Sequence, residues 1–325
     1  MRTIDWVDGY PLIVEQTLLP GELRFIALST VDDVVAAIVR LAVRGAPALG
    51  VAGAMGVALA ARLGGDVDAD VRRLRAARPT AVNLAWGVDR AAARLPEGAD
   101  AVLAEALAIR DEEIAAAHEM GRRGADLLDT LVDRSPRILT HCNAGGLATV
   151  EYGTALAPIR TLHERGRLAQ VLTAETRPLL QGARLTAWEL AEAGIAHRLI
   201  GDSAGPALMA QGYVDAVVVG ADRICANGDV LNKIGTYAHA LGAHAAGLPF
   251  LVVAPESTVD TATKSGADVE IEQRSGEELL GVGGRRTAPA GTTALNPAFD
   301  VTPAALITAI VTEARVIRLD LGELP

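Results

Sequence analysis

Two polar segments follow short apolar runs, and each carries a side chain that could transfer protons. The segment HCNAGG, residues 141–146, comes directly after the apolar run 137–140. Its two glycines permit a tight turn, and the N–H groups of a following helix could lower the pKa of the thiol. Cys142 is therefore a candidate base or nucleophile. A buried cysteine that packs as a small hydrophobic residue is the alternative, and position alone favours neither.

The segment GADRI, residues 220–224, follows the very apolar run Ala216–Val219. A carboxyl group that emerges from an apolar wall has its pKa raised by desolvation, so Asp222 could act as an acid near neutrality. On position alone, an aspartate that caps the next turn or pairs with Arg223 is the better interpretation. Cys225 is interpreted as a packed thiol beside this segment.

The segment RGAP, residues 44–47, is a candidate anion site. Pro47 suits the first turn of a helix, so the backbone N–H groups near Gly45 and Ala46 would point outward beside the guanidinium of Arg44. A phosphate group would fit there. A plain helix start with a surface arginine is an equal alternative.

Four further polar residues stand where loops should meet the sheet edge. Arg78 lies at a second helix entrance, and Gln181 follows the run 169–173, where its amide could bind sugar hydroxyls. Asn232 and Lys233 precede an expected helix and could hold hydroxyl and phosphate oxygens. A solvated surface lysine is the usual alternative for Lys233.

Two patterns of hydrophobic residues predict the elements that position these groups. Apolar residues recur at helical spacing from about residue 30 to 130, after short strands at 11–14 and 22–26. Beyond residue 135, short apolar runs alternate with longer helical segments. The expected strands are 137–140, 169–173, 197–200, 216–219 and 249–253, and the expected helices are near 147–165, 182–193, 203–211 and 234–246.

This alternation predicts right-handed βαβ crossovers and a parallel sheet covered on both faces. The predicted fold class is α/β, with a smaller, mainly helical N-terminal domain at 1–130 and a Rossmann-like, doubly wound C-terminal domain at 131–325. Ligands bind such sheets at the carboxyl ends of the strands, where the candidate residues fall.

Composition limits the classes of partner. The net charge is −10 and the sequence pI is near 5.1, so a nucleic-acid partner is not expected. An anionic small substrate is compatible with this charge because it needs only a local cation.

The apolar run 44–62 is mainly Ala and Gly and contains Pro47, so a buried helix is expected rather than a membrane span. The N-terminal residues show no export signal, which predicts a cytoplasmic protein.

Cofactors are not indicated either. The only two cysteines form no CxxC pair, so neither disulfides nor structural zinc are expected. No expected strand is followed by a dinucleotide-binding glycine fingerprint, and this argues against a nicotinamide cofactor.

Read together, these segments resemble the methylthioribose-1-phosphate isomerase family, which is related to the regulatory subunits of the initiation-factor-2B exchange factor. The resemblance covers essentially the whole chain. It departs at Glu15, where the family commonly has aspartate, and at 313–315, where a glycine often follows. The matching segments are EQTLLP (15–20), RGAPALG (44–50), RPTAVNL (78–84), HCNAGGLAT (141–149), ETRPLLQGARLTAWEL (175–190), GADRICANGDVLNKIGTY (220–237) and NPAFDVTP (296–303).

The resemblance implies an intramolecular oxidoreductase that converts 5-methylthioribose 1-phosphate, an aldose, to the ketose 5-methylthioribulose 1-phosphate in methionine salvage. It implies a homodimer without metal or cofactor, with Cys142 and Asp222 as the catalytic proton-transfer pair. The implied substrate-binding residues are Arg44, Gly45, Ala46, Arg78, Gln181, Asn232 and Lys233.

Two alternatives accompany this hypothesis. One is an isomerase of ribose 1,5-bisphosphate or 5-deoxyribose 1-phosphate that uses the same cysteine and aspartate. The other is a non-catalytic regulatory subunit of a translation-initiation exchange factor. The presence of Cys142, Asp222 and the complete loop at Arg44 argues against the second.

Overall fold

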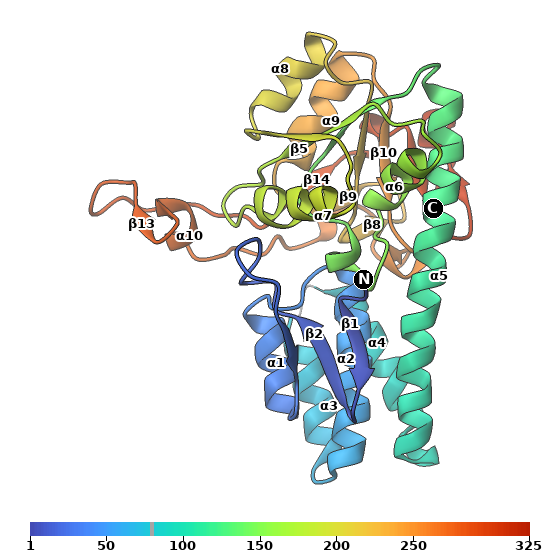
Figure 1. Ribbon diagram of the computed structural model, residues 1–325, viewed down its shortest axis with the longest axis vertical. Helices are drawn as coiled ribbons and strands as arrows, with labels where there is room; N and C mark the ends of the chain where they lie inside the picture. Colours follow the sequence, from blue (N-terminus) through green and yellow to red (C-terminus); the bar gives the residue numbers. More distant parts are fainter. Residues whose placement is uncertain (79–80) are drawn as a thin grey trace.

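The computed structural model describes residues 1–78 and 81–325, and its N-terminal part is mainly helical, as predicted (Figure 1). A small antiparallel sheet precedes the helices, so the expected short strands are present. The strands are β1 (Ile4–Val7), β2 (Tyr10–Val14) and β3 (Phe25–Ala27), and the helices are α1 (Val31–Val39), α2 (Ala46–Leu63), α3 (Val67–Ala76), α4 (Val82–Ala92) and α5 (Ala99–Leu131).

Helix α2 is the centre of this part. Every residue from Ala46 to Ala60 is buried, and the helix packs against α4 and α5. By length and composition it could cross a membrane, but most of its length is buried inside the protein. The apolar run is therefore a helix covered by other parts of the chain, and its N-terminus is fixed at Gly45.

The C-terminal part contains a seven-stranded sheet in the order β16-β15-β10-β7-β4-β5-β6. Its strands are parallel except β16, which runs antiparallel to β15. This confirms the predicted Rossmann-like sheet. The strands are β4 (Arg137–Thr140), β5 (Gln170–Ala174), β6 (His197–Ile200), β7 (Ala216–Val219), β10 (Phe250–Val253), β15 (Ala309–Val311) and β16 (Val316–Ile317), and the helices are α6 (Leu156–Glu164), α7 (Ala187–Glu192), α8 (Ala204–Ala210) and α9 (Thr236–Ala245).

Alternate residues of each strand face opposite layers. Ile138 and Val218 pack with α5 and α6 on one face, whereas Leu139 and Val217 pack with α8 and α9 on the other. Because both faces are buried, the strands read as continuous apolar runs. The sheet is doubly wound, as its sequence pattern predicted.

The strand order places a topological switch point between β4 and β7. Strands β4, β5 and β6 proceed toward one edge, and the chain then returns to place β7 beside β4 before continuing to β10 and β15. Crossovers leave this point in opposite directions, so the loops after β4 and β7 separate and leave room for a ligand. Cys142 and Asp222 stand in these two loops.

Two features were absent from the prediction. One is a four-stranded sheet in the order β11-β8-β9-β14, beside the switch point. The other is an arm that projects from the body at one side (Figure 1). The sheet contains β8 (Arg223–Cys225), β9 (Val230–Lys233), β11 (Val259–Asp260) and β14 (Phe299–Thr302), and the arm contains α10 (Glu277–Leu280), β12 (Gly281–Val282) and β13 (Arg285–Arg286).

Two predicted helices differ from the structure. The helix expected at 147–165 begins only at Leu156, because Thr154 and Leu156 both donate their backbone N–H groups to Ala144 O, at 2.9 and 3.2 Å. This contact turns the chain back toward the HCNAGG loop. The helix expected at 182–193 opens with a π-helical turn, Gly182–Thr186, before α7.

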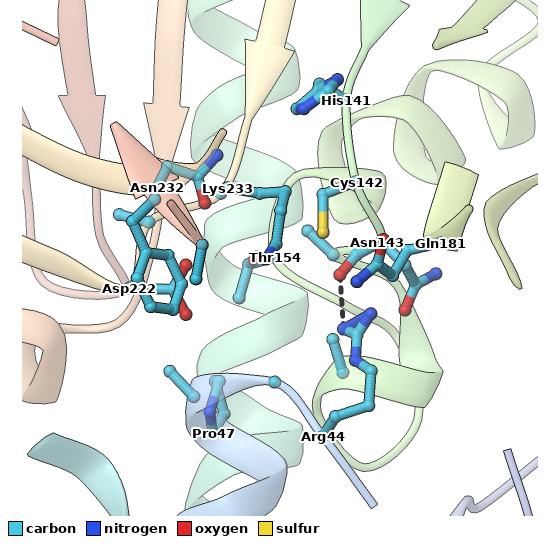
Figure 2. A pocket seen from close by; sticks show the side chains of 18 of the residues that line it. Arg44, Pro47, His141, Cys142, Asn143, Thr154, Gln181, Asp222, Asn232 and Lys233 are labelled. Atoms are coloured by element: carbon cyan, nitrogen blue, oxygen red, sulfur yellow. Dashed lines mark hydrogen bonds between the residues drawn. The ribbon is translucent and has the colours of Figure 1, made fainter. Parts of the chain in front are cut away.

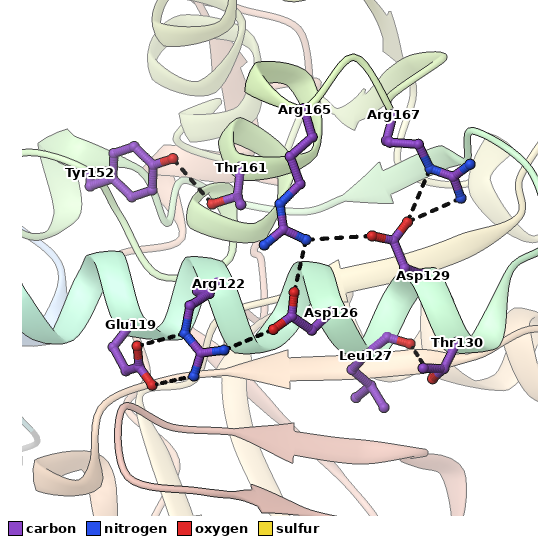
Figure 3. A network of polar contacts seen from close by, with 10 residues as sticks. All are labelled: Glu119, Arg122, Asp126, Leu127, Asp129, Thr130, Tyr152, Thr161, Arg165 and Arg167. Carbon is purple, nitrogen blue, oxygen red and sulfur yellow. Dashed lines mark hydrogen bonds and ion pairs between the residues drawn. The ribbon is translucent and has the colours of Figure 1, made fainter.

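Helix α5 joins the two parts. It packs against α2 near one end and against α6 near the other, so it lies along both the N-terminal and the C-terminal part (Figure 1). Arg165 lies 2.8 Å from Asp126 and 3.4 Å from Asp129, which ties the end of α6 to α5 (Figure 3). Partly exposed pairs of this kind contribute about 0–1 kcal/mol each. The domain boundary at 130/131 stays a prediction. It falls inside α5, which runs from the N-terminal part to the C-terminal part.

Candidate active site

A single cavity lies at the switch point and contains all nine residues that the sequence singled out. It encloses about 790 Å³ of space, its open mouth included. The roles of these residues remain predictions, but their convergence from separate elements is a property of the fold. They are Arg44, Gly45, Ala46, Arg78, Cys142, Gln181, Asp222, Asn232 and Lys233. Pro79 and Thr80, which belong to the segment after Arg78, lie outside the described residues.

The backbone of Cys142 is held by two buried threonines. Cys142 adopts a left-handed conformation, with φ at 62°. Its N–H donates to Thr176 Oγ1 at 2.9 Å, and its carbonyl accepts a 2.6 Å hydrogen bond from Thr186 Oγ1. This conformation is uncommon for a residue with a Cβ, so the two bonds fix the direction of the thiol. Figure 2 shows the thiol directed into the cavity.

The loop after Cys142 is organised around the buried carboxylate of Glu189. This carboxylate accepts hydrogen bonds from Asn143 Nδ2 at 2.8 Å and from Gly146 N at 2.7 Å, and Arg160 lies 3.0 Å away. A Cβ on Gly145 would overlap the carboxylate. Glu189 thus fills the space of the missing side chain and satisfies the loop's donors.

Arg44 enters the cavity from the N-terminus of α2. It is only 8% exposed, and its Nη2 donates a 2.6 Å hydrogen bond to Asn143 O (Figure 2). Its Nη1 has no hydrogen-bond partner among residues 1–78 and 81–325. The interpretation of Arg44 as a surface residue is therefore wrong, because α2 and the cysteine loop bury it. A buried donor with a positive charge and no partner favours an anionic ligand.

Gly45 makes the close approach of α2 to the cysteine loop possible. It caps α2 with φ at 97°, and a Cβ there would overlap the backbone of Ala148. Pro47 occupies the first turn, as predicted. The helix N-terminus and the guanidinium of Arg44 consequently face the same cavity.

Asp222 leaves the buried strand β7 and is tied to β9 by a 2.9 Å hydrogen bond from its backbone N–H to Leu231 O. Burial raises the pKa of its carboxyl group, and Lys233, Arg78 and Arg44 oppose this only in part. The alternative pairing with Arg223 is wrong, since that guanidinium lies 3.2 Å from Asp260 instead. Asp222 is thus an acid that retains its proton to higher pH than an exposed aspartate.

The thiol of Cys142 also has a raised pKa. Burial is the main cause, and the positive charges of Arg44 and Lys233 act in the opposite direction. The predicted lowering by a following helix is wrong, because only the three-residue turn Gly146–Ala148 follows and burial outweighs it. Cys225 is a fully buried core thiol, as interpreted, and burial raises its pKa to about 11.

The remaining candidates surround this pair. Lys233 Nζ lies 4.9 Å from the centre of the Phe299 ring, and burial lowers the pKa of the ammonium group. Gln181 is buried, and its Oε1 has no partner in the described part of the chain. Asn232 donates to Thr236 Oγ1 at 2.9 Å. Arg78 Nη2 lies 3.5 Å from Glu272.

Sequence reasoning missed four polar residues of the cavity wall, His141, Asn143, Thr154 and Arg274. His141 Nε2 lies 2.8 Å from Ile234 O, and burial lowers its pKa to about 4, so the ring is neutral. Arg274 lies 2.6 Å from Glu278 at the base of the arm. His141 could have been found from its place beside Cys142, whereas Arg274 follows no strand and has no sequence signal.

Comparisons with known proteins identify the family of the chain. Residues 42–318 match the model of the Initiation factor 2 subunit family. A methylthioribose-1-phosphate isomerase from Anaeromyxobacter sp. (strain K) is 56% identical over 98% of this chain and 94% of its own. A 5-deoxyribose 1-phosphate isomerase from Moorella thermoacetica is 51% identical over 97% of this chain and 93% of its own.

Two solved structures have the same fold. The 5-methylthioribose 1-phosphate isomerase from Pyrococcus horikoshii OT3 superposes with a TM-score of 0.90 at 42% identity, over 98% of this chain and 92% of that one. A protein described as translation initiation factor eIF-2B, subunit delta, from A. fulgidus gives 0.84 at 44% identity, over 98% and 96%. The chain therefore belongs to the Initiation factor 2 subunit family and is similar to methylthioribose-1-phosphate isomerases along nearly its whole length.

Proposed function

We propose that this protein is an aldose–ketose isomerase that converts 5-methylthioribose 1-phosphate to 5-methylthioribulose 1-phosphate in methionine salvage. One observation carries the proposal: Cys142 and Asp222 face the same cavity as a buried guanidinium, Arg44, whose Nη1 has no partner in the described residues. Two proton-transfer groups beside an anion site are what a sugar-phosphate isomerase needs. The names of the full-length relatives agree with this chemistry.

Asp222 is the acid of the proposed reaction. The phosphate on the anomeric oxygen prevents spontaneous ring opening, so a proton must be supplied to the ring oxygen. Burial raises the pKa of the Asp222 carboxyl group, so this group holds its proton to higher pH than an exposed aspartate. Protonation of the ring oxygen then breaks its bond to C1.

Cys142 is the base that accepts the proton from C2. Burial raises the pKa of the thiol, and the positive charges of Arg44 and Lys233 oppose this rise, so they reduce the cost of forming the thiolate. Loss of the C2 proton gives an enediol phosphate. The thiol, whose proton exchanges with solvent, then donates a proton to C1, while the proton of the 2-hydroxyl group restores Asp222, so substrate and product remain isomers.

Arg44 and Lys233 are the proposed ligands of the phosphate, together with the N-terminus of α2. A guanidinium can bind two phosphate oxygens at once, whereas Lys233 provides a point charge. Gln181 and Asn232 supply amide groups for the sugar hydroxyls. Arg78 is placed beside Asp222, where its charge opposes the rise in the pKa of that carboxyl group.

A product assay in D₂O tests the proposal. Purified protein is incubated with 5-methylthioribose 1-phosphate without added metal, and the ketose is identified by NMR. We expect turnover and deuterium at C1, because a proton on Cys142 exchanges with solvent. A product without deuterium would indicate a hydride shift instead of proton transfer through Cys142. The absence of turnover would refute the proposed isomerase activity.

The Moorella relative supports 5-deoxyribose 1-phosphate as a second candidate substrate. The A. fulgidus structure carries the name of an initiation-factor subunit, so a non-catalytic regulatory subunit is the alternative to an enzyme. Stable co-purification with initiation factor and no turnover of any sugar phosphate would favour that role. We also propose that the protein is a cytoplasmic homodimer, which light scattering in solution and imaging of a tagged chain would test.

A further inference from the structure

A second cavity opens where helices α4 and α5 of the N-terminal part meet the turns after β10 and β15 of the C-terminal part. It encloses about 1030 Å³ of space, its open mouth included. Pro255 is the one residue that also lines the active-site cavity, so the two cavities are neighbours with otherwise separate walls. We call the second one the junction cavity because both parts of the chain contribute to it.

Carboxylates dominate the polar wall of the junction cavity. They are Glu112, Glu113, Glu119 and Glu313. Glu112 already pairs with Arg90, whose Nη2 lies 2.8 Å from its Oε1. Glu119 pairs with Arg122 at 2.7 Å (Figure 3). These two carboxylates are therefore neutralised by the protein itself, and the other two are the ones to consider for a ligand.

Glu113 is buried in the wall of this cavity without a bonding partner. The residue is only 6% exposed, yet no described residue donates a hydrogen bond to its carboxyl group or forms an ion pair with it. Arg90 acts on it only through its charge, because that guanidinium is bonded to Glu105 and Glu112. A buried carboxyl group without a partner is unfavourable. Glu113 thus has free bonding capacity for a ligand in the cavity.

Glu313 adds a second carboxylate from the C-terminal part. Its carboxylate accepts a 3.0 Å hydrogen bond from the backbone N–H of Glu256, and no cationic side chain in the described part of the chain pairs with it. Arg123 donates to the backbone carbonyl of Glu313 at 3.1 Å instead. The charge of Glu313 raises the pKa of Glu113, so the two groups repel each other when both are ionised. A cation bound between them would remove this repulsion.

We propose that the junction cavity binds a small organic cation, an ammonium group on a short aliphatic chain, between Glu113 and Glu313. An ammonium group has three donors and can therefore bond to both carboxylates at once. Trp86, Ala115 and Ala116 provide apolar surface for the chain. A metal ion fits less well, because within the described residues no three His, Cys, Asp or Glu side chains are grouped closely enough to hold one. This inference is independent of the proposed isomerase function.

Glu113 makes the proposed binding depend on pH. Burial and the negative charges of Glu313 and Glu112 raise the pKa of its carboxyl group to about 8, and the positive charge of Arg90 opposes this rise. Near neutrality the group is therefore mostly protonated, and the ammonium ion must displace this proton. Affinity should increase roughly ten-fold per pH unit up to about pH 8 and then level off.

Isothermal titration calorimetry of the whole chain with n-butylammonium chloride tests the site. We expect saturable binding of one ligand per chain. Titrations in buffers of different ionisation enthalpy should show release of about one proton per ligand near pH 7 and almost none near pH 9. n-Butanol has the same chain without the charge and should bind at least about ten-fold more weakly, because it cannot form the two charge-assisted hydrogen bonds.

Two glutamine variants identify the carboxylates. Glu113→Gln should weaken binding of n-butylammonium at least about ten-fold and abolish the proton release, since the amide keeps the shape of the side chain but does not ionise. Glu313→Gln should weaken binding by a similar factor, and it decides the matter if the buried variant does not fold. Glu97→Gln removes an exposed carboxylate outside the cavity and should leave binding unchanged. No binding by the wild type, equal affinity in the folded glutamine variants, or affinity that does not change between pH 6 and 8 would overturn the proposal.

Discussion

The hydroxyl of Thr186 lies 2.6 Å from the carbonyl oxygen of Cys142 and donates a hydrogen bond to it. Thr186 is fully buried in the π-helical turn that opens α7, 44 residues beyond the cysteine. A non-glycine residue in the left-handed region costs on the order of 1–3 kcal/mol, so the surrounding structure must hold Cys142 there. The position of the thiol therefore depends on a side chain that contacts no substrate in the proposed reaction.

Thr186→Val should lower kcat with little change in KM. The replacement keeps the shape of the side chain but leaves the buried Cys142 carbonyl without its donor, which costs about 1–3 kcal/mol. Thr186→Ser restores the hydroxyl and should recover most of kcat. Equal activity of the valine and serine variants would show that the hydrogen bond does not position the thiol.

Cys142→Ser and Asp222→Asn should each abolish turnover while substrate binding persists. Both replacements are close in shape to the native side chain, so they alter proton affinity more than packing. General acid–base catalysis contributes roughly 10²–10⁴-fold, and kcat should fall by at least this factor. Single-turnover assays and calorimetric titration with substrate measure the two effects separately, and a variant within a few-fold of wild type would remove that residue from the mechanism.

The pH dependence of alkylation reports the ionisation of Cys142. Iodoacetamide reacts with the thiolate, and burial raises the pKa of this thiol, so the reaction should accelerate only at a pH above the range of an exposed cysteine. Bound substrate should protect the thiol. Labelling at Cys225 that follows the loss of activity would show that the wrong cysteine was chosen.

Lys233→Met should shift the same alkylation curve to higher pH. The ammonium group of Lys233 opposes the rise in the pKa of Cys142 that burial causes, so its removal should raise this pKa further. At a fixed pH below the midpoint the variant should therefore react more slowly. Lys264→Met removes the only other lysine of the chain from an exposed position and serves as the control. An unchanged pH dependence of alkylation would show that Lys233 does not influence the ionisation of the thiol.

Arg44→Ala should weaken phosphate binding. The loss of charge-assisted hydrogen bonds costs about 1.5–3 kcal/mol, or roughly ten- to a hundred-fold in affinity. Inorganic phosphate should compete with substrate in the wild type and much less well in the variant. Arg44→Lys should also bind weakly, because a point charge replaces the planar guanidinium. Arg62→Ala removes the same charge from the exposed last turn of α2 and should change neither KM nor phosphate inhibition.

The central sheet was the most predictable part of the fold. The expected strands at 137–140, 197–200 and 216–219 coincide with β4, β6 and β7. Short apolar runs that alternate with helical segments leave few other arrangements, because parallel strands need right-handed crossovers. Cys142 and Asp222 could be placed at one edge for the same reason: each follows a strand.

Other parts depend on contacts that no local pattern encodes. Glu189 was not assigned to the site, since its hydrogen bonds to Asn143 and Gly146 span more than 40 residues. Strands β11, β12 and β13 have two residues each, which is too short for an alternating pattern. Arg274 reaches the cavity only because the base of the arm returns to the body.

The contact between Gly145 and Glu189 limits how this family can change over evolutionary time. The carboxylate occupies the space that any larger side chain at position 145 would need. A substitution at 145 alone would displace it and leave Gly146 N and Asn143 Nδ2 without their acceptor, while a shorter residue at 189 would leave the same donors unpaired. Each single change is harmful on its own, so the two positions should be replaced together or not at all. Across an alignment they should behave as one inherited unit, although they belong to different segments of the chain.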